Sequence, residues 1–338
     1  MLLIQIKSLK IDFYLFKFHN LQRFLINLNV NHNNNKHYYL YSYLQMKPKG
    51  ILVIIGGAVD KGSFTEKDFA PDVSQNLNFF ERGILKRILK ESKNGNDSQI
   101  EIITTASKVP KTVGAEYSKA FAYLGATNVS TMEIEKREQA NSVQIVERLR
   151  KADIVMFTGG DQLRLTSILG GTDFHTLLLE KYENEQFVIA GTSAGAAAAS
   201  DQMIYQGSSS EALRKGEVKV TSGLGFIDDV VIDTHFVQRG RIGRLFQAVA
   251  SNPRTLGIGL GEDTGLIIKE NNVMEAIGSG LVILVDGRKI RDTNITQVAL
   301  GSPISIEHLV VHVLSMGDTY MLETHTMKIF EHVLADEE

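Results

Sequence analysis

Beyond residue 50, apolar residues fall into short continuous runs that alternate with stretches in which they recur every three or four positions. The run at 51–55 is apolar throughout and is closed by Gly56 and Gly57, a pattern typical of a strand buried on both faces of a parallel sheet. Apolar positions between 77 and 89 have helical spacing. The alternation then predicts strands at 100–103, 129–134, 154–157 and 187–190 and helices at 117–124, 142–149 and 173–182.

This alternation specifies an α/β protein, and the predicted fold class is a three-layer sandwich built on a mainly parallel sheet. No stretch before about residue 215 is rich in Pro, Gly and Ser, as an interdomain linker would be. We therefore expect one folded domain without internal repeats. Its C-terminal part should be closed by strands at 266–269, 273–277, 282–285 and 310–314.

The first 45 residues differ in composition from the rest of the chain. They contain no Gly, Ala, Pro, Glu or Thr, and their charge of +4 leaves −7 for the remainder. Charged residues interrupt the apolar stretches, so neither a signal peptide nor a transmembrane span is expected. We predict that residues 1–45 are an extension outside the folded domain, which spans 46–338, and that translation begins at Met46. The alternative is a basic amphipathic arm that contacts a membrane or a partner.

Composition changes this picture mainly by what it excludes. A net charge of −3 over 338 residues argues against nucleic-acid binding. The chain has no Cys, which excludes disulfides, thiolate metal sites and a Cys nucleophile, and makes the cytoplasm the expected compartment. The nine His are scattered, and His308 and His312 lie in an alternating, strand-like stretch. We therefore expect no metal and no cofactor.

The candidate chemistry centres on G-T-S-A-G at 191–195, which directly follows the strand expected at 187–190. Alanines at 196–199 favour a helix, so Ser193 is placed on a strand-to-helix turn, as in a nucleophile elbow. Such a turn is too tight for side chains at its two glycines. The N–H groups that begin the helix would point to the position where an oxyanion forms. The alternative is that Ser193 only caps the helix.

A nucleophilic serine needs a base, and the base needs a carboxylate that orients it. His235 follows an apolar strand expected at 230–232, at the strand end where α/β sheets bind ligands. The strand expected at 256–260 leads to Glu262 and Asp263. Residue type alone does not decide which of these two neighbouring carboxylates orients the histidine.

A further polar cluster, T-G-G-D-Q at 158–162, ends the strand expected at 154–157. Its glycines would let backbone N–H groups approach a ligand closely. Each cluster taken alone has an ordinary structural explanation, because turns favour Gly and Asp. Four polar clusters at four strand ends together predict an active site.

These motifs resemble the cyanophycinase family of serine peptidases. The resemblance covers about residues 47–290. It implies a fold shared with dipeptidase E and class I glutamine amidotransferase domains, and an exopeptidase that releases β-aspartyl-arginine dipeptides from cyanophycin. It also implies that 46–338 is a peptidase domain. The motifs that carry it are F-T-G-G-D-Q at 157–162, G-T-S-A-G at 191–195, D-x-H-F-x-Q-R-G-R-x-G-R at 233–244 and G-x-G-x-x-E-D-T at 257–264.

The resemblance implies a role for each matching residue. Ser193 matches the nucleophile, His235 the general base, and Glu262 the acid that orients the base. The oxyanion-hole region matches Gly160, Asp161 and Ala194, and the residues lining the substrate pocket match Gln162, Asp233, Arg239, Arg241 and Arg244, with Thr234 beside them.

The residue types suit this substrate, because a β-aspartyl-arginine unit presents carboxylates and a guanidinium group. Arg241 and Arg244 are three positions apart on a helix expected to begin near Gln238, so they could face one way and bind a carboxylate. The alternative is that these arginines form a solvated helix face.

One residue departs from the family pattern, because Thr234 stands where cyanophycinases carry Gln. The shorter side chain leaves two alternatives open: a related dipeptidase acting on N-terminal aspartyl or β-aspartyl peptides, and a non-catalytic amidotransferase-like binding domain. An inactive domain is expected to lack a base or an acid, and this chain has both. The expected partners are a peptide substrate and a second copy of the chain in a homodimer, with no membrane and no nucleic acid.

Overall fold

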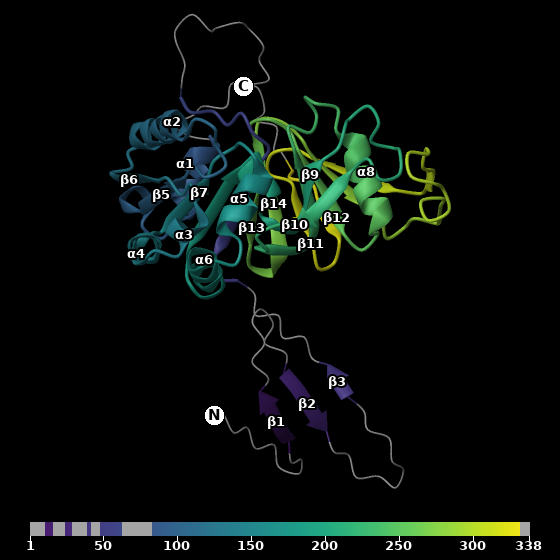
Figure 1. Ribbon diagram of the computed structural model, residues 1–338, viewed down its shortest axis with the longest axis horizontal. Helices are drawn as coiled ribbons and strands as arrows, with labels where there is room; N and C mark the ends of the chain where they lie inside the picture. Colours follow the sequence, from purple (N-terminus) through teal and green to yellow (C-terminus); the bar gives the residue numbers. More distant parts are fainter. Residues whose placement is uncertain (1–10, 16–23, 29–38, 42–47, 63–82, 332–338) are drawn as a thin grey trace, which may run out of the picture. The chain divides into compact units, whose positions relative to one another are not determined.

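The computed structural model describes residues 11–15, 24–28, 39–41, 48–62 and 83–331. The chain divides into two units, 1–47 and 48–338. The first unit contains an antiparallel sheet (Figure 1) with the strands β1 (Ile11–Leu15), β2 (Phe24–Leu28) and β3 (Tyr39–Tyr41) in that order. That residues 1–45 lie outside the peptidase domain stays a prediction.

The second unit is built on a nine-stranded sheet whose central part is parallel. The parallel strands, in spatial order, are β4 (Ile51–Ile55), β8 (Val188–Thr192), β7 (Ile154–Phe157), β5 (Gln99–Ile103) and β6 (Asn128–Met132). This arrangement brings the carboxyl ends of five strands to one edge, where α/β folds bind ligands. Beyond β4 the sheet continues with the antiparallel strands β13 (Thr264–Lys269), β14 (Val273–Gly278), β19 (Thr319–Met321) and β20 (Thr326–Lys328).

Helices cover both faces of this sheet, which confirms the predicted three-layer α/β sandwich (Figure 1). On β4, Val53 and Ile55 belong to one core cluster and Leu52 and Ile54 to the other, as the two-residue period of a strand requires. The first cluster is covered by α1 (Ile84–Glu91) and α2 (Pro110–Tyr123). The second is covered by α3 (Arg137–Ala140), α4 (Val143–Lys151), α5 (Gln162–Leu169), α6 (Asp173–Asn184) and α7 (Ala194–Ala197).

Local signals in the sequence explain where several helices begin. Pro110 is the first residue of α2, where its fixed φ suits the helix and its missing N–H costs nothing. Ser142 caps α4 and Thr172 caps α6, each accepting a hydrogen bond from a backbone N–H in the first turn. These caps satisfy donors that a helix start leaves unpaired.

A second, six-stranded sheet packs beside the first. Met203 and Ile232 on one of its faces belong to the main core, whereas Ile204 and Val231 on the other pack against α8 (Ile242–Ser251). In spatial order its strands are β10 (Lys219–Ser222), β9 (Ser200–Gln206), β11 (Ile227–Thr234), β12 (Leu256–Leu260), β15 (Val282–Asp286) and β18 (Val310–Leu314). The short elements are β16 (Asp292–Thr293), β17 (Ile306–Glu307) and the 3-10 turns η1 (Gly95–Asp97) and η2 (Glu270–Asn272).

The structure adds to the sequence expectations and corrects them in several places. The strands β9 and β10 were not predicted, and the predicted strands at 256–260, 282–285 and 310–314 join this second sheet. The expected helix start near Gln238 is wrong: a turn that includes Gly240 at φ 57° intervenes, and α8 begins at Ile242. Positions 77–82 of the first predicted helix lie outside the described residues.

Candidate active site

Ser193 stands between β8 and α7 with φ 51° and ψ −109°, a backbone conformation that is strained for any residue other than glycine. Close packing explains its glycine neighbours. A Cβ on Gly191 would lie 2.6 Å from the backbone carbon of Gly195, and one on Gly195 would lie 2.6 Å from the Cβ of Phe157. The N–H of Ser193 donates to the carbonyl oxygen of Ile55 at 2.9 Å, so β4 holds the turn. The half-buried hydroxyl is therefore presented at the carboxyl edge of the sheet.

His235 comes from the other sheet and meets the serine hydroxyl. It directly follows β11 with φ 49°, and its N–H donates to the carbonyl oxygen of Gly56 at 2.7 Å. Its Nε2 lies 3.1 Å from Ser193 Oγ. Gly57 lies against the imidazole ring, because a Cβ there would be 2.3 Å from its Cε1. From the sequence, Gly57 was expected only to close the strand at 51–55, together with Gly56.

Glu262 is the carboxylate that contacts the histidine. Its Oε1 lies 2.6 Å from His235 Nδ1, and the two side chains are 35% and 14% exposed. The N–H of Glu262 donates to the side-chain oxygen of Gln238 at 3.1 Å. Gln238 belongs to the motif at 233–244, but no role was expected for it from the sequence. It links the turn after His235 to the loop that carries Glu262.

Asp263, the neighbouring carboxylate, points elsewhere. One of its oxygens accepts the N–H of Asp60 at 3.0 Å, and the other accepts the hydroxyl of Ser279 at 2.9 Å. Its own N–H donates to the carbonyl oxygen of Gly57 at 2.8 Å. Burial raises the pKa of the Asp263 carboxyl, against the effect of these hydrogen bonds. Glu262 and Asp263 are thus distinguished by their partners. Glu262 contacts the imidazole of His235, whereas Asp263 links the loops around it.

The glycine loop after β7 borders the serine. A Cβ on Gly159 would lie 3.3 Å from the Cβ of Ser193. Gly160 has φ 145°, and a Cβ there would lie 2.0 Å from the carbonyl oxygen of Ala106. The same oxygen accepts the N–H of Asp161 at 2.9 Å, so this N–H is engaged. The Asp161 carboxylate caps α5.

Two backbone N–H groups remain as candidate oxyanion donors beside Ser193. Ala194 is the first residue of α7, a position whose N–H has no partner within its own helix. The N–H of Gly160 donates to no acceptor among the described residues. Of the three residues that the resemblance assigns to this region, Gly160 and Ala194 therefore retain available donors.

Asp233, Arg241 and Arg244 form a buried ion cluster behind His235. Arg241 Nη1 donates to Asp233 Oδ1 at 3.1 Å and to the carbonyl oxygen of Thr234 at 2.8 Å. Arg244 Nε lies 3.0 Å from Asp233 Oδ2, but the two atoms lack hydrogen-bond geometry. Both atoms are buried, and neither has a hydrogen-bond partner among the residues that the structure describes. Burial raises the pKa of Asp233, whereas the two guanidinium groups act in the opposite direction. The expectation that both arginines face one way is met, but the carboxylate they face is Asp233.

The other sequence-predicted substrate residues occupy different places. Gln162, the first residue of α5, donates from its side-chain nitrogen to the carbonyl oxygen of Ile204 at 3.0 Å and so joins α5 to β9. Arg239 is exposed on the turn that follows His235. Thr234 ends β11, and the residue is only 4% exposed.

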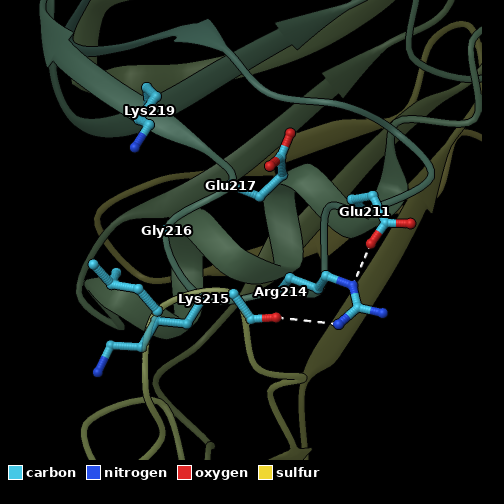
Figure 2. A pocket seen from close by; sticks show the side chains of 8 residues that line it. Glu211, Arg214, Lys215, Gly216, Glu217 and Lys219 are labelled. Carbon is cyan, nitrogen blue, oxygen red and sulfur yellow. Dashed lines mark hydrogen bonds and ion pairs between the residues drawn. The ribbon is translucent and has the colours of Figure 1, made fainter.

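A separate hollow of about 270 Å³ lies on the surface near residues 211–219 and 300–301 (Figure 2). The arginine that lines it, Arg214, already has partners within the protein. It forms an ion pair with Glu211 and donates to the carbonyl oxygen of Gly301 at 3.1 Å (Figure 2). Lys215 Nζ donates to the carbonyl oxygen of Val298 at 2.8 Å. None of the sequence-predicted site residues lines this hollow.

A strained serine on a strand-to-helix turn, in contact with a histidine, is the arrangement of a serine-type peptidase. The sequence profile of peptidase family S51 matches residues 76–276, and the chain belongs to this family. It is a serine-type peptidase that acts on peptides, as the motifs predicted. None of the described helices is long and apolar enough to cross a membrane.

The curated relatives are named more specifically. The chain is 34% identical to the cyanophycinase of Nostoc sp. (strain PCC 7120) over 279 residues, which cover 82% of this chain and 88% of the relative. It is also 34% identical to the cyanophycinase of Geminocystis herdmanii (strain PCC 6308) over 274 residues, covering 81% and 94%. A crystal structure of a peptidase from an acI-B1 Actinobacterium shares the fold, with a TM-score of 0.57, 20% identity, and coverage of 83% of this chain and all of that chain.

Proposed function

We propose that this protein is a cyanophycinase-like serine exopeptidase in which Ser193, His235 and Glu262 form the catalytic triad. The observation that supports the proposal is an unbroken line of contacts. Ser193 Oγ lies 3.1 Å from His235 Nε2, and His235 Nδ1 lies 2.6 Å from Glu262 Oε1. The nucleophile, the base and the orienting acid of a triad require these two contacts.

In the proposed reaction, His235 Nε2 accepts the proton of Ser193 Oγ as this oxygen attacks the scissile carbonyl carbon. Glu262 accepts a hydrogen bond from Nδ1–H, which selects the tautomer with a free Nε2 and stabilises the imidazolium ion. The N–H groups of Gly160 and Ala194 would donate to the oxyanion. The C–N bond then breaks, and His235 gives its proton to the leaving amine. A water molecule, deprotonated by His235, finally hydrolyses the acyl-enzyme and releases Ser193.

The proposed substrate is cyanophycin, from which the enzyme releases β-aspartyl-arginine dipeptides. The names of the curated relatives support this choice. In the substrate pocket, Arg239 and Arg241 would offer guanidinium groups to substrate carboxylates. Asp233, which is 2% exposed, would hold Arg241 in place through its ion pair, and Arg244 lies against the other oxygen of the same carboxylate. Gln162 would complete the pocket from α5.

A second candidate is a dipeptidase that acts on N-terminal aspartyl or β-aspartyl peptides. Thr234 favours it, because the residue is 4% exposed and so presents little surface to a polymer unit. Its carbonyl oxygen is also engaged, by Arg241 Nη1 at 2.8 Å. Strict recognition of the polymer would then rest on Arg239, Arg241 and Gln162.

One experiment separates the two candidates. The purified protein is incubated with cyanophycin, with β-Asp-Xaa dipeptides and with Asp-Xaa dipeptides, and the products are identified by mass. Release of β-aspartyl-arginine from the polymer is the expected result. Refusal of the polymer together with cleavage of the dipeptides would favour the dipeptidase, and no cleavage of any substrate would contradict both.

We also propose that the enzyme acts in the cytoplasm as a homodimer. The absence of Cys supports the compartment, and the family resemblance supports the dimer. Light scattering coupled to gel filtration measures the mass directly. A mass near twice 37.5 kDa is expected, and the mass of one chain would contradict the proposal.

A further inference from the structure

We infer that Gln238 is a positioning residue for the proposed catalytic acid, and that its side-chain oxygen fixes the loop from which Glu262 reaches the imidazole of His235. The inference rests on the proposed triad and deepens it. Gln238 lies on the turn that follows His235, and its Oε1 accepts the N–H of Glu262 at 3.1 Å. The base and the residue that positions the acid are therefore only three positions apart in the sequence.

The carboxylate of Glu262 has few contacts of its own. Its Oε1 lies 2.6 Å from His235 Nδ1, and this imidazole is its one hydrogen-bond partner within the part of the chain that the structure describes. The side chain is 35% exposed, so water competes for the carboxylate oxygens. Several rotatable bonds also separate the carboxylate from the main chain. The direction of the carboxylate therefore depends on the backbone that carries it.

The backbone around Glu262 is held by hydrogen bonds on both sides. The N–H groups of Gly261 and Asp263 donate to backbone carbonyl oxygens at 3.2 and 2.8 Å, and the carbonyl oxygen of Glu262 accepts the hydroxyl of Thr264 at 2.8 Å. The N–H of Glu262 donates to no backbone acceptor among the described residues, and Gln238 is its partner. A single side chain thus satisfies this N–H, and its removal would leave the peptide group between 261 and 262 less restrained.

The turn that carries Gln238 is itself fixed to the second sheet. The N–H of Arg241 donates to the carbonyl oxygen of Phe236 at 3.0 Å, which closes the turn. Phe236 is 1% exposed, and its own N–H donates at 3.0 Å to the carbonyl oxygen of Leu260, the last residue of β12. Because Gln238 projects from this fixed turn, its side chain can set the position of the acid loop rather than follow it.

The exposure of Gln238 separates a positioning role from a purely structural one. The residue is exposed, and an exposed hydrogen bond contributes little to the stability of a fold. Catalysis is more sensitive, because a small misplacement of a group in the active site lowers the rate strongly. Loss of the Gln238 oxygen should therefore change kcat much more than it changes Tm.

The test compares two substitutions of Gln238 in the full chain. Gln238→Met keeps the length of the side chain but offers only a weakly accepting sulfur, whereas Gln238→Glu keeps an acceptor oxygen. We expect Gln238→Met to lower kcat about thirtyfold and to leave KM within about twofold, whereas Gln238→Glu should retain kcat within about threefold. The Tm of Gln238→Met should fall by no more than about 3 °C. Gln144→Met, at an exposed position of α4, is the matched control and should behave like the wild type.

A second comparison asks whether Gln238 acts through Glu262. In the Glu262→Gln background, Gln238→Met should lower kcat by less than about twofold, because the two changes affect one interaction. The rate at which a serine-reactive fluorophosphonate labels Ser193 should follow the same pattern. This second measurement does not depend on the identity of the substrate.

Four results would overturn the positioning role: no loss of kcat in Gln238→Met, a change confined to KM, an equal loss in Gln238→Glu, or a loss that persists undiminished beside Glu262→Gln. The proposed function is tested separately by Glu262→Gln alone. If this variant keeps both its kcat and its rate of Ser193 labelling, the triad fails and the positioning role fails with it. If Glu262→Gln is impaired but Gln238→Met is not, the triad stands and only the positioning role is lost.

Discussion

The two sides of Ser193 are built in different ways. On one side, backbone hydrogen bonds and the close approach of Gly57 hold His235 in contact with Glu262. These contacts restrict the position of the imidazole ring. On the other side, beyond the glycine loop, exposed charges of both signs surround a pocket at the ends of β5 and β6. Under the proposed function, the first side fixes the geometry of proton transfer, whereas the second presents exposed charged side chains to solvent.

This difference sets the size of the effects expected on each side. A displaced triad atom loses catalysis by orders of magnitude, because the reacting groups act as a unit. Exposed charges around a pocket contribute modest, solvent-screened energies that change KM more than kcat.

The largest effect is expected for Ser193→Ala. Removing the nucleophile should lower kcat on the preferred β-aspartyl substrate by about six orders of magnitude, because the triad acts as one unit. The fold should be unchanged, since His235 is the one hydrogen-bond partner of the hydroxyl among the described residues. Peptide-release kinetics together with circular dichroism checks both statements, and retention of more than a few per cent of activity would refute the serine mechanism.

Next is the choice between the two neighbouring carboxylates. Glu262→Gln should lower kcat by about four orders of magnitude, because the amide no longer favours the tautomer of His235 with a free Nε2. Asp263→Asn should cost far less, because Asp263 contacts Asp60 and Ser279 rather than the imidazole. Steady-state kinetics of both variants measures the ratio, and equal losses would mean that Asp263 is also part of the proton-transfer system.

Gly57→Ala should move the imidazole without changing any titratable group. The new Cβ would lie 2.3 Å from His235 Cε1, so the ring must shift, and kcat should fall by about a hundredfold. Gly225→Ala is the matched control, because Gly225 also has positive φ but no atom lies within 4 Å of an added Cβ. Similar kcat losses in the two variants would show that backbone strain, not the histidine contact, explains the effect.

A smaller, pH-dependent effect is expected at Asp263. Burial raises the pKa of its carboxyl in the folded protein above that of the unfolded chain, about 3.9 for an ordinary Asp. Between these two values the folded state binds a proton that the unfolded state does not, so this group lowers the unfolding free energy as pH rises. The Tm of the wild type should therefore fall relative to that of Asp263→Asn as pH rises above about 4. Thermal melts across pH check the sign, and a relative rise of the wild-type Tm would contradict it.

The smallest effect is expected from removing residues 1–45. A chain that starts at Met46 should keep full peptidase activity and shift its Tm by no more than about a few degrees, the equivalent of roughly 1 kcal/mol. Thermal melting and peptide hydrolysis measure both. A large loss of soluble protein would show that the extension covers part of the core. Loss of membrane association without loss of activity would support the amphipathic-arm alternative.

Much of this architecture was predictable from the hydrophobic pattern. The five parallel strands are apolar runs or follow helices with regular spacing, so their order along the chain was readable. The strand β9 was not, because Ser200–Gln206 is half polar and follows a run of alanines that favours a helix. The spatial order of strands, and therefore the second sheet, depends on long-range pairing that no local pattern encodes.

The candidate site shows the same limit. The strand ends at Ser193, His235 and Glu262 were marked by glycines and polar residues, but the residues alone did not separate Glu262 from Asp263. That difference comes from the backbone turn at Asp263, which has φ 44°. The contacts of Gly57 and Gln238 likewise join segments far apart in the sequence, so they become visible only in the folded chain.

The central claim is that His235 and Glu262 activate Ser193, and covalent labelling tests it most directly. A serine-reactive fluorophosphonate is added to the full chain, and the modified residue is located by peptide mass analysis. One label is expected, on Ser193, and it should be lost in His235→Asn, greatly slowed in Glu262→Gln and nearly unchanged in Asp263→Asn. Labelling of another residue, or equal labelling of Ser193 in all three variants, would contradict it.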